Sequence, residues 1–162
     1  MSVGRSRAHG EGFVDLRGIT AQLAWSRRVI RTGAVSWRVG ASGGNAFSST
    51  ALSNGSDLEC YERPDGTCTP SLPSIYFASA LAGLEFAGSS ASIALHAGPT
   101  WFGASTVQTP ASGMGTDARV DATVRLAKKV GLSLQGRLLV LPQLGEGTMR
   151  VRSLSIGPRF GW

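Results

Sequence analysis

Residues 118–126 read ARVDATVRL and alternate strictly between apolar and polar side chains. The apolar side chains occupy every second position: Ala118, Val120, Ala122, Val124 and Leu126. The positions between them are polar or charged: Arg119, Asp121, Thr123 and Arg125. Successive side chains of a β-strand point to opposite faces of the sheet. The stretch therefore predicts a strand with one apolar face and one polar face.

The same alternation recurs along the chain. The further segments that show it are residues 13–25, 33–41, 76–86, 91–101, 130–140 and 154–162. Two of them are irregular: the first changes phase near Gly18, which predicts a β-bulge, and the third has Ile75, Phe77 and Leu81 on its polar side. Seven strands in 162 residues predict an all-β chain that folds as a single domain, residues 1–162.

The composition excludes several classes of protein. Charged residues make up 16% of the chain and 22 residues are glycine, which argues against disorder and against a helical bundle. No apolar run reaches the ~18 residues of a transmembrane helix, and residues 1–12 lack the apolar core of a signal peptide. The net charge is +6, but the basic residues are spread along the chain, so we expect no nucleic-acid partner.

Ten-residue strands with one apolar face fit two kinds of barrel. A soluble barrel points its apolar face inward, whereas a membrane barrel points it outward to lipid and fills the interior with small and polar side chains. Alternation alone leaves both open, because the charged positions are surface residues in one case and lumen residues in the other.

The C-terminal strand favours the membrane barrel. Its apolar side chains occupy alternate positions up to the last residue: Leu154, Ile156, Pro158, Phe160 and Trp162. This pattern resembles the C-terminal assembly signal of bacterial outer-membrane β-barrels, with Trp162 in place of the commoner Phe and with Pro158 unusual inside a strand. The resemblance implies an antiparallel up-and-down transmembrane β-barrel of the eight-stranded class. It also implies location in the bacterial outer membrane, contact with its lipid, and recognition of this strand by the barrel assembly machinery.

The connections alternate between long and short, as in outer-membrane barrels. Residues 42–73 and 103–116 are long and rich in Gly, Ser and Thr or Pro, and we expect them to be outer loops. If the last strand descends to the periplasm, residues 1–12 form an irregular segment outside. An even strand number then requires a further strand and a signal peptide upstream, so the chain is expected to be N-terminally truncated. The alternative is that residues 1–12 form an irregular eighth strand.

The polar faces predict a buried charge network in a lumen too narrow for a pore. Its expected members are Arg38, Glu85, His96, Arg119, Asp121, Arg125, Arg137 and Arg159. Buried charges must be paired, and the arginine excess needs loop acids, water or lipid phosphates. A structural role is the main interpretation, and anion or ligand binding is the alternative.

His96 is the single histidine inside a predicted strand, and it raises the question of catalysis. Outer-membrane lipid A deacylases, which share this barrel class, use a neighbouring His and Ser with an acid. Here Ala97 and Gly98 follow His96, so the His-x-Ser spacing of those enzymes is absent. We expect His96 to be a hydrogen-bonded lumen residue, and we expect no catalytic residue, metal or cofactor.

Cys60 and Cys68 are the only cysteines, and they flank the turn Pro64-Asp65-Gly66. A turn of this composition brings the two thiols together, which predicts a structural disulfide in an exported protein.

Aromatic residues and glycines complete the pattern. The aromatics near the ends of the apolar faces predict an interfacial girdle: Trp25, Trp37, Tyr76, Trp101, Phe160 and Trp162. Residues 40–44 and 113–115 are glycine-rich without the Lys-Ser/Thr of a phosphate loop, which predicts flexible loops.

The leading hypothesis is a porin-like outer-membrane barrel with a structural or surface-interaction role and no catalysis, whose loops bind a ligand the sequence does not name. The alternatives are a soluble lipocalin- or avidin-like barrel that binds an apolar ligand and a barrel enzyme that acts on lipid.

Overall fold

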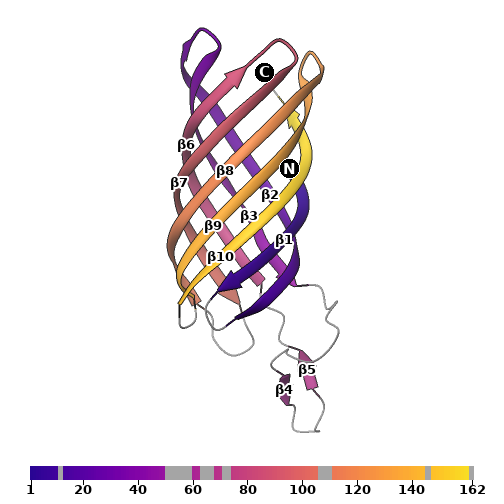
Figure 1. Cartoon of the computed structure of the whole chain (residues 1–162), viewed down its shortest axis with the longest axis vertical. Coiled ribbons are helices and arrows are strands. Elements are labelled where there is room, and N and C mark those ends of the chain that lie inside the picture. Colours follow the sequence, from indigo (N-terminus) through magenta and orange to yellow (C-terminus); the bar gives the residue numbers. More distant parts are fainter. Residues whose placement is uncertain are drawn as a thin grey trace.

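The computed structural model of the chain is an eight-stranded antiparallel β-barrel (Figure 1). The structure describes residues 1–10, 13–49, 60–62, 68–70, 74–105, 111–144 and 147–160. The barrel strands are β1 (Ser2–Gly10), β2 (Phe13–Thr32), β3 (Val35–Ser49), β6 (Ser74–Ala87), β7 (Ala91–Ser105), β8 (Ala111–Ala127), β9 (Val130–Leu144) and β10 (Gly147–Phe160). They close in the order β1-β10-β9-β8-β7-β6-β3-β2, so the prediction of an antiparallel up-and-down β-barrel is confirmed.

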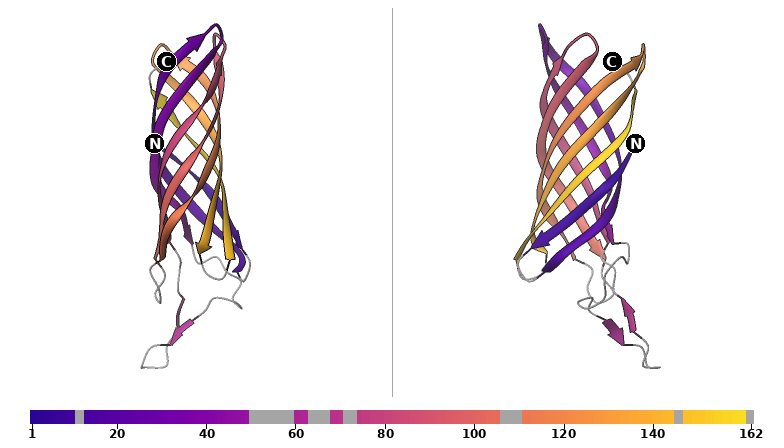
Figure 2. Two further views of the ribbon diagram at one scale, coloured as in Figure 1. Left: turned by 90° about the vertical axis from the view of Figure 1, so that its left-hand side faces the viewer. Right: turned by 45° about the vertical axis from the view of Figure 1, so that its right-hand side comes forward.

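The two ends of the barrel differ. At the turn end, β2–β3, β6–β7 and β8–β9 are joined by short turns, and the first turn uses Gly33 at a φ of 62°, which favours glycine. At the loop end, residues 50–73 and 106–110 form the longer connections, whereas residues 11–12 and 145–146 are connections of two residues. A small hairpin of β4 (Cys60–Glu62) and β5 (Cys68–Pro70) is drawn beyond this rim (Figures 1 and 2). Strand β10 ends at the turn end (Figure 1).

The N-terminal residues form a strand. Ser2–Gly10 pairs with β10 on one side and with β2 on the other, and this pairing closes the barrel. The prediction of an irregular outer segment is therefore wrong for these residues, and they supply the eighth strand of the alternative. Because β1 pairs with β2 only as far as Gln22, the rest of β2 is paired with β3 alone.

Several strands extend into segments predicted as loops. β3 continues to Ser49 and contains residues 40–44, and β8 begins at Ala111 and contains residues 113–115. The prediction of flexible glycine loops at these two places is wrong, because cross-strand pairing holds the glycines in extended backbone. The bulge expected near Gly18 lies slightly further on, between Ile19 and Ala21 of the β2–β3 pair.

Polar and apolar side chains are distributed as in a membrane barrel. The large exposed side chains of the outer wall include Leu95, Val120, Leu134 and Ile156, each about half exposed. The mid-barrel interior is polar. Small and charged residues are buried there, with Glu85, Asp121 and Arg137 at 2 to 5% exposure.

The interior changes character toward the loop end, where a cluster of apolar side chains fills it. We call this cluster the loop-end plug: Ala8, Ala46, Ile75, Phe77, Phe102, Ala104, Leu139, Leu141, Met149 and Val151. The inward positions of Ile75 and Phe77, which broke the alternation of their strand, are explained by this packing.

No helix long and apolar enough to cross a membrane occurs among the described residues.

Candidate functional site

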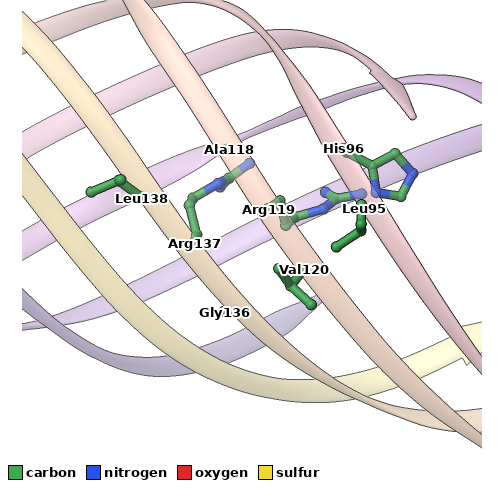
Figure 3. A pocket seen from close by; sticks show the side chains of 8 residues that line it. All are labelled: Leu95, His96, Ala118, Arg119, Val120, Gly136, Arg137 and Leu138. Atoms are coloured by element: carbon green, nitrogen blue, oxygen red, sulfur yellow. The ribbon is translucent and has the colours of Figure 1, made fainter. Parts of the chain in front are cut away.

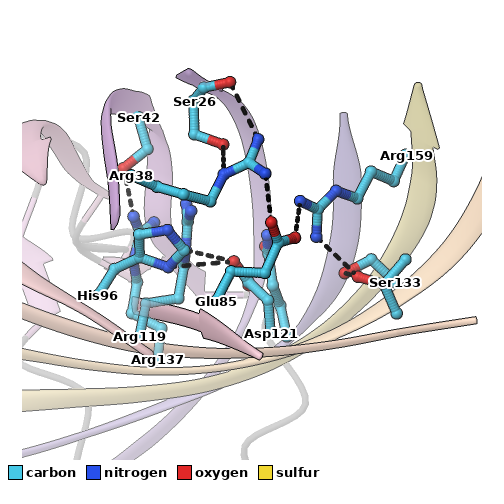
Figure 4. A network of polar contacts seen from close by, with 12 residues as sticks. Ser26, Arg38, Ser42, Glu85, His96, Arg119, Asp121, Ser133, Arg137 and Arg159 are labelled. Atoms are coloured by element: carbon cyan, nitrogen blue, oxygen red, sulfur yellow. Dashed lines mark hydrogen bonds and ion pairs between the residues drawn. The ribbon is translucent and has the colours of Figure 1, made fainter. Parts of the chain in front are cut away.

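Glu85 is the centre of the polar network near the turn end of the lumen (Figure 4). It is 2% exposed on β6. Arg38 from β3 and Arg159 from β10 each donate a hydrogen bond to this carboxylate at 2.6 Å, and Arg28 approaches it at 3.5 Å. One buried anion thus joins strands from opposite sides of the barrel.

Arg137 is the centre of a second group, nearer the loop end. Its Nε and Nη2 donate to the two carboxylate oxygens of Asp117 at 3.0 and 2.8 Å, which is a bidentate pair. The same guanidinium donates to Gln22 and Ser42 and lies 4.1 Å from the ring centroid of Phe77. The cation therefore connects the polar lumen to the loop-end plug.

His96, Arg119 and Asp121 form a third group. Asp121 Oδ2 lies 3.0 Å from Arg119 Nε and 3.5 Å from His96 Nδ1. All three residues are at most 5% exposed, so the group is buried.

The network brings together seven of the eight residues predicted for it. Arg125 is the exception. It continues the inward phase of Thr123 and is paired with Gly131, but its side chain is exposed at the end of the barrel next to the β8–β9 turn, where the regular register ends. It is therefore not one of the buried residues of the network.

Sequence analysis missed Asp117 and Gln22, which contact Arg137. Asp117 lies between the predicted loop, residues 103–116, and the predicted strand, residues 118–126, although Arg119 and Asp121 continue the same alternation from it. Gln22 lies on the irregular first segment. Its contact with Arg137 of β9 forms only when the barrel closes, and the alternation of single strands does not predict which strands meet on closure.

The chemistry of this network is pairing of charges. Its carboxylates and guanidiniums contact one another, and Gln22, Gln135, Ser2 and Ser155 add hydrogen bonds across the closure between β9, β10, β1 and β2. Among the described residues no three His, Cys, Asp or Glu side chains gather to hold a metal. The arrangement stabilises the closed barrel and leaves the lumen filled.

The cysteines lie on the small hairpin. Cys60 is opposite Pro70 and Cys68 is opposite Glu62, so the two cysteines are not direct cross-strand partners. Their side chains lie outside the part of the chain that the structure describes, and the Pro64-Asp65-Gly66 turn does too. The disulfide stays a prediction.

The disulfide prediction has a direct chemical test. We expect unfolded, unreduced protein from an oxidising compartment to resist maleimide, and to take up two equivalents after reduction, one for each of its 2 cysteines. Mass spectrometry measures both states, and Cys60→Ser, which leaves Cys68 unpaired, serves as the labelling control. Full labelling before reduction would contradict the prediction.

Aromatic side chains lie on the outer wall. Trp25, Trp37, Tyr76, Trp101 and Phe160 are exposed by 50 to 72%. Trp37 follows the β2–β3 turn, whereas Tyr76 and Trp101 lie near the loop ends of β6 and β7. Trp162 is outside the described residues.

These features define a class of fold: a closed eight-stranded antiparallel barrel with an apolar exterior and a polar lumen, as in the outer-membrane barrels. Solved structures that share it include those of three proteins. Neisserial surface protein A (NspA) matches with a TM-score of 0.70 at 13% identity, over 99% of this chain and 94% of that one. The outer membrane enzyme PagL matches with a TM-score of 0.58 at 11% identity, over 98% and 99%.

The attachment invasion locus protein Ail of Yersinia pestis matches with a TM-score of 0.53 at 15% identity, over 98% of this chain and 95% of that one. At such identities the likeness is one of fold. No family model and no curated protein matches the sequence.

Proposed function

We propose that this chain is an outer-membrane β-barrel whose role is structural or in surface interaction, without catalysis. The observation that carries the proposal is the exposed apolar wall around a closed polar lumen. Half-exposed Leu, Ile and Val side chains on this scale are unfavourable in water and are what lipid requires. The solved structures that share the fold support the location.

The height of the apolar wall supports the same proposal. Tyr76 and Phe86 are exposed near opposite ends of β6, ten residues apart. At ~3.4 Å per residue and a tilt of about 40° this spans about 25 Å, the height of the apolar band of such barrels.

The proposed orientation follows from the connections. Outer-membrane barrels have short turns in the periplasm and longer loops outside. The turn end, with the C-terminus, then faces the periplasm, where the last strand meets the assembly machinery. The loop end, with the β4–β5 hairpin, faces outward and carries any recognition of a partner (Figure 2).

Refolding from urea tests the proposal. We expect the chain to need detergent micelles or lipid vesicles to fold, and to migrate differently on a gel before and after boiling, because a closed barrel resists unheated detergent. In vesicles, external protease should leave the barrel strands intact. A monomer that is soluble without detergent would overturn the proposal.

The lipid-enzyme alternative lacks support in the described residues. His96 is 5% exposed and Ser92 is 3% exposed, and both face the lumen. Both side chains therefore point away from the apolar outer face of the wall. The likeness to PagL is one of fold, so it does not transfer that protein's activity.

The soluble-barrel alternative requires an apolar cavity inside. Here the mid-lumen is polar and charged, and the apolar side chains inside belong to the loop-end plug, which is packed to 6% exposure or less. Neither part of the interior suits an apolar ligand.

A further inference from the structure

An arginine cluster lies on the outside of the wall toward the loop end. It spans three neighbouring strands: Arg5 and Arg7 of β1, Arg17 of β2, and Arg150 and Arg152 of β10. All five side chains are exposed. We call them the outer arginines.

The register places three of the outer arginines in one row. Arg7 is the direct partner of Arg152 on one side and of Arg17 on the other. Like charges directly opposite each other in a sheet are destabilising, so an anion bound to this row would stabilise it.

The barrel acids whose side chains the structure describes, Glu85, Asp117 and Asp121, do not supply that anion. They are 1 to 5% exposed and lie inside the lumen. The ion pairs between described side chains join these carboxylates to lumen-facing groups and to Arg28, and none involves an outer arginine.

An apolar hollow lies beside the outer arginines. It has a volume of about 370 Å³ and is lined by the outward-facing residues Leu95, Ala118, Val120, Gly136 and Leu138, with the inward-facing His96, Arg119 and Arg137 from the same strands (Figure 3). Gly136 forms its floor, because a Cβ added there would meet no atom within 4 Å. Any larger residue at this position would fill the hollow.

The hollow and the outer arginines are continuous. Leu138 is the partner of Arg152, and Gly136 is the partner of Leu154, which in turn pairs with Arg5. The front strands rise from left to right in Figure 1, so a row perpendicular to them descends toward the loop end from β9 to β1. The arginines are therefore nearer the loop end and the hollow is deeper in the apolar wall.

We infer that this face binds a phosphorylated lipid of the outer leaflet, with its phosphate groups on Arg7, Arg152 and Arg17 and an acyl chain in the hollow at Gly136. The inference rests on the proposed membrane location. Guanidinium groups match phosphate in charge and in bidentate geometry, and the hollow lies one strand away on the side that faces lipid. An anionic lipid would contact both the outer arginines and the apolar hollow. A soluble anion would contact only the arginines, so the site fits the lipid better.

The test uses the refolded barrel in phosphatidylcholine nanodiscs that contain lipid A, a bisphosphorylated acylated disaccharide. Native mass spectrometry counts the lipid A retained per barrel. We expect retention by the unmodified chain, and about 10- to 30-fold weaker retention for Arg7→Gln with Arg152→Gln, since each cation near anionic headgroups adds about 1 kcal/mol. Gly136→Leu should weaken it about 5-fold by excluding the acyl chain.

Matched controls separate the site from general charge and bulk. Arg27→Gln with Lys128→Gln removes the same charge from exposed positions nearer the turn end, and Leu132→Phe adds bulk to the outer face of β9 away from the hollow. Both should retain lipid A like the unmodified chain. Lipid A lacking its phosphates should bind weakly, and excess inorganic phosphate should displace little of the intact lipid.

The outcomes are distinguishable from those of the proposed function. A barrel that inserts and is heat-modifiable, yet retains lipid A no better than its dephosphorylated form, overturns the lipid site alone. Equal losses in the control and test variants overturn it too, and displacement by phosphate alone assigns the arginines to a soluble anion. A chain that does not insert into the nanodisc overturns the membrane proposal.

Discussion

Val120→Arg is expected to destabilise the folded barrel by about 2–4 kcal/mol in lipid vesicles. Val120 is 48% exposed near the middle of β8, at the height where the proposed bilayer has no water. A guanidinium there loses its hydration and gains no partner. Denaturant titration followed by tryptophan fluorescence measures the change in the free energy of unfolding.

Leu126→Arg on the same strand is the matched control. Leu126 is 67% exposed beside the β8–β9 turn, where an arginine reaches water, so the expected cost is about 0–1 kcal/mol. Equal costs at the two positions would show that the wall does not face a bilayer, whereas a stabilising effect of both would indicate an aqueous exterior.

Glu85→Ala is expected to destabilise the barrel by about 3 kcal/mol, because it leaves the guanidiniums of Arg38 and Arg159 facing each other without their shared anion. These side chains are 11 and 18% exposed, which gives water limited access to them. The same denaturant titration measures the loss of stability. A slope of unfolding free energy against denaturant equal to that of the unmodified chain would show that the change is in stability rather than in compactness.

A double variant separates charge from packing at this site. Adding Arg38→Met to Glu85→Ala removes one of the stranded cations, and we expect it to recover part of the lost stability. Lys128→Ala, an exposed charge at a turn, should change stability by less than about 0.5 kcal/mol. If Glu85→Ala has as little effect as Lys128→Ala, the network does not stabilise the barrel.

Six barrel strands and their outward-facing sides were predictable because each has an apolar face of period two. The C-terminal strand was too, although Pro158 breaks its pattern. Pro158 lies beyond the pairing of β1 with β10. Its missing N–H therefore removes no backbone hydrogen bond between these two strands.

β1 escaped prediction for a physical reason that its neighbours explain. Its inward positions are Ser2, Gly4, Ser6 and Ala8, and its outward positions after Val3 are Arg5, Arg7 and His9. A strand that presents arginines outward has no apolar face, so alternation of hydropathy does not find it. The two arginines of β1, Arg5 and Arg7, therefore prevented its prediction, and both belong to the outer arginines of the proposed lipid site.

The sequence predicted which residues face the lumen, but it did not predict which of them contact each other. Polar inward positions identify which residues are buried, whereas the pairing of Arg137 with Asp117 depends on the register between β8 and β9. The hollow at Gly136 depends on what surrounds one glycine on three strands, which no single segment contains.

The loop-end plug has a consequence for permeability. The described side chains of the plug come from β1, β3, β6, β7, β9 and β10, so this part of the lumen is packed by the strands of the wall. In the proposed orientation the plug lies below the outer loops. Changes in the length or sequence of those loops, or their cleavage by a protease, would then leave this packing of the lumen in place.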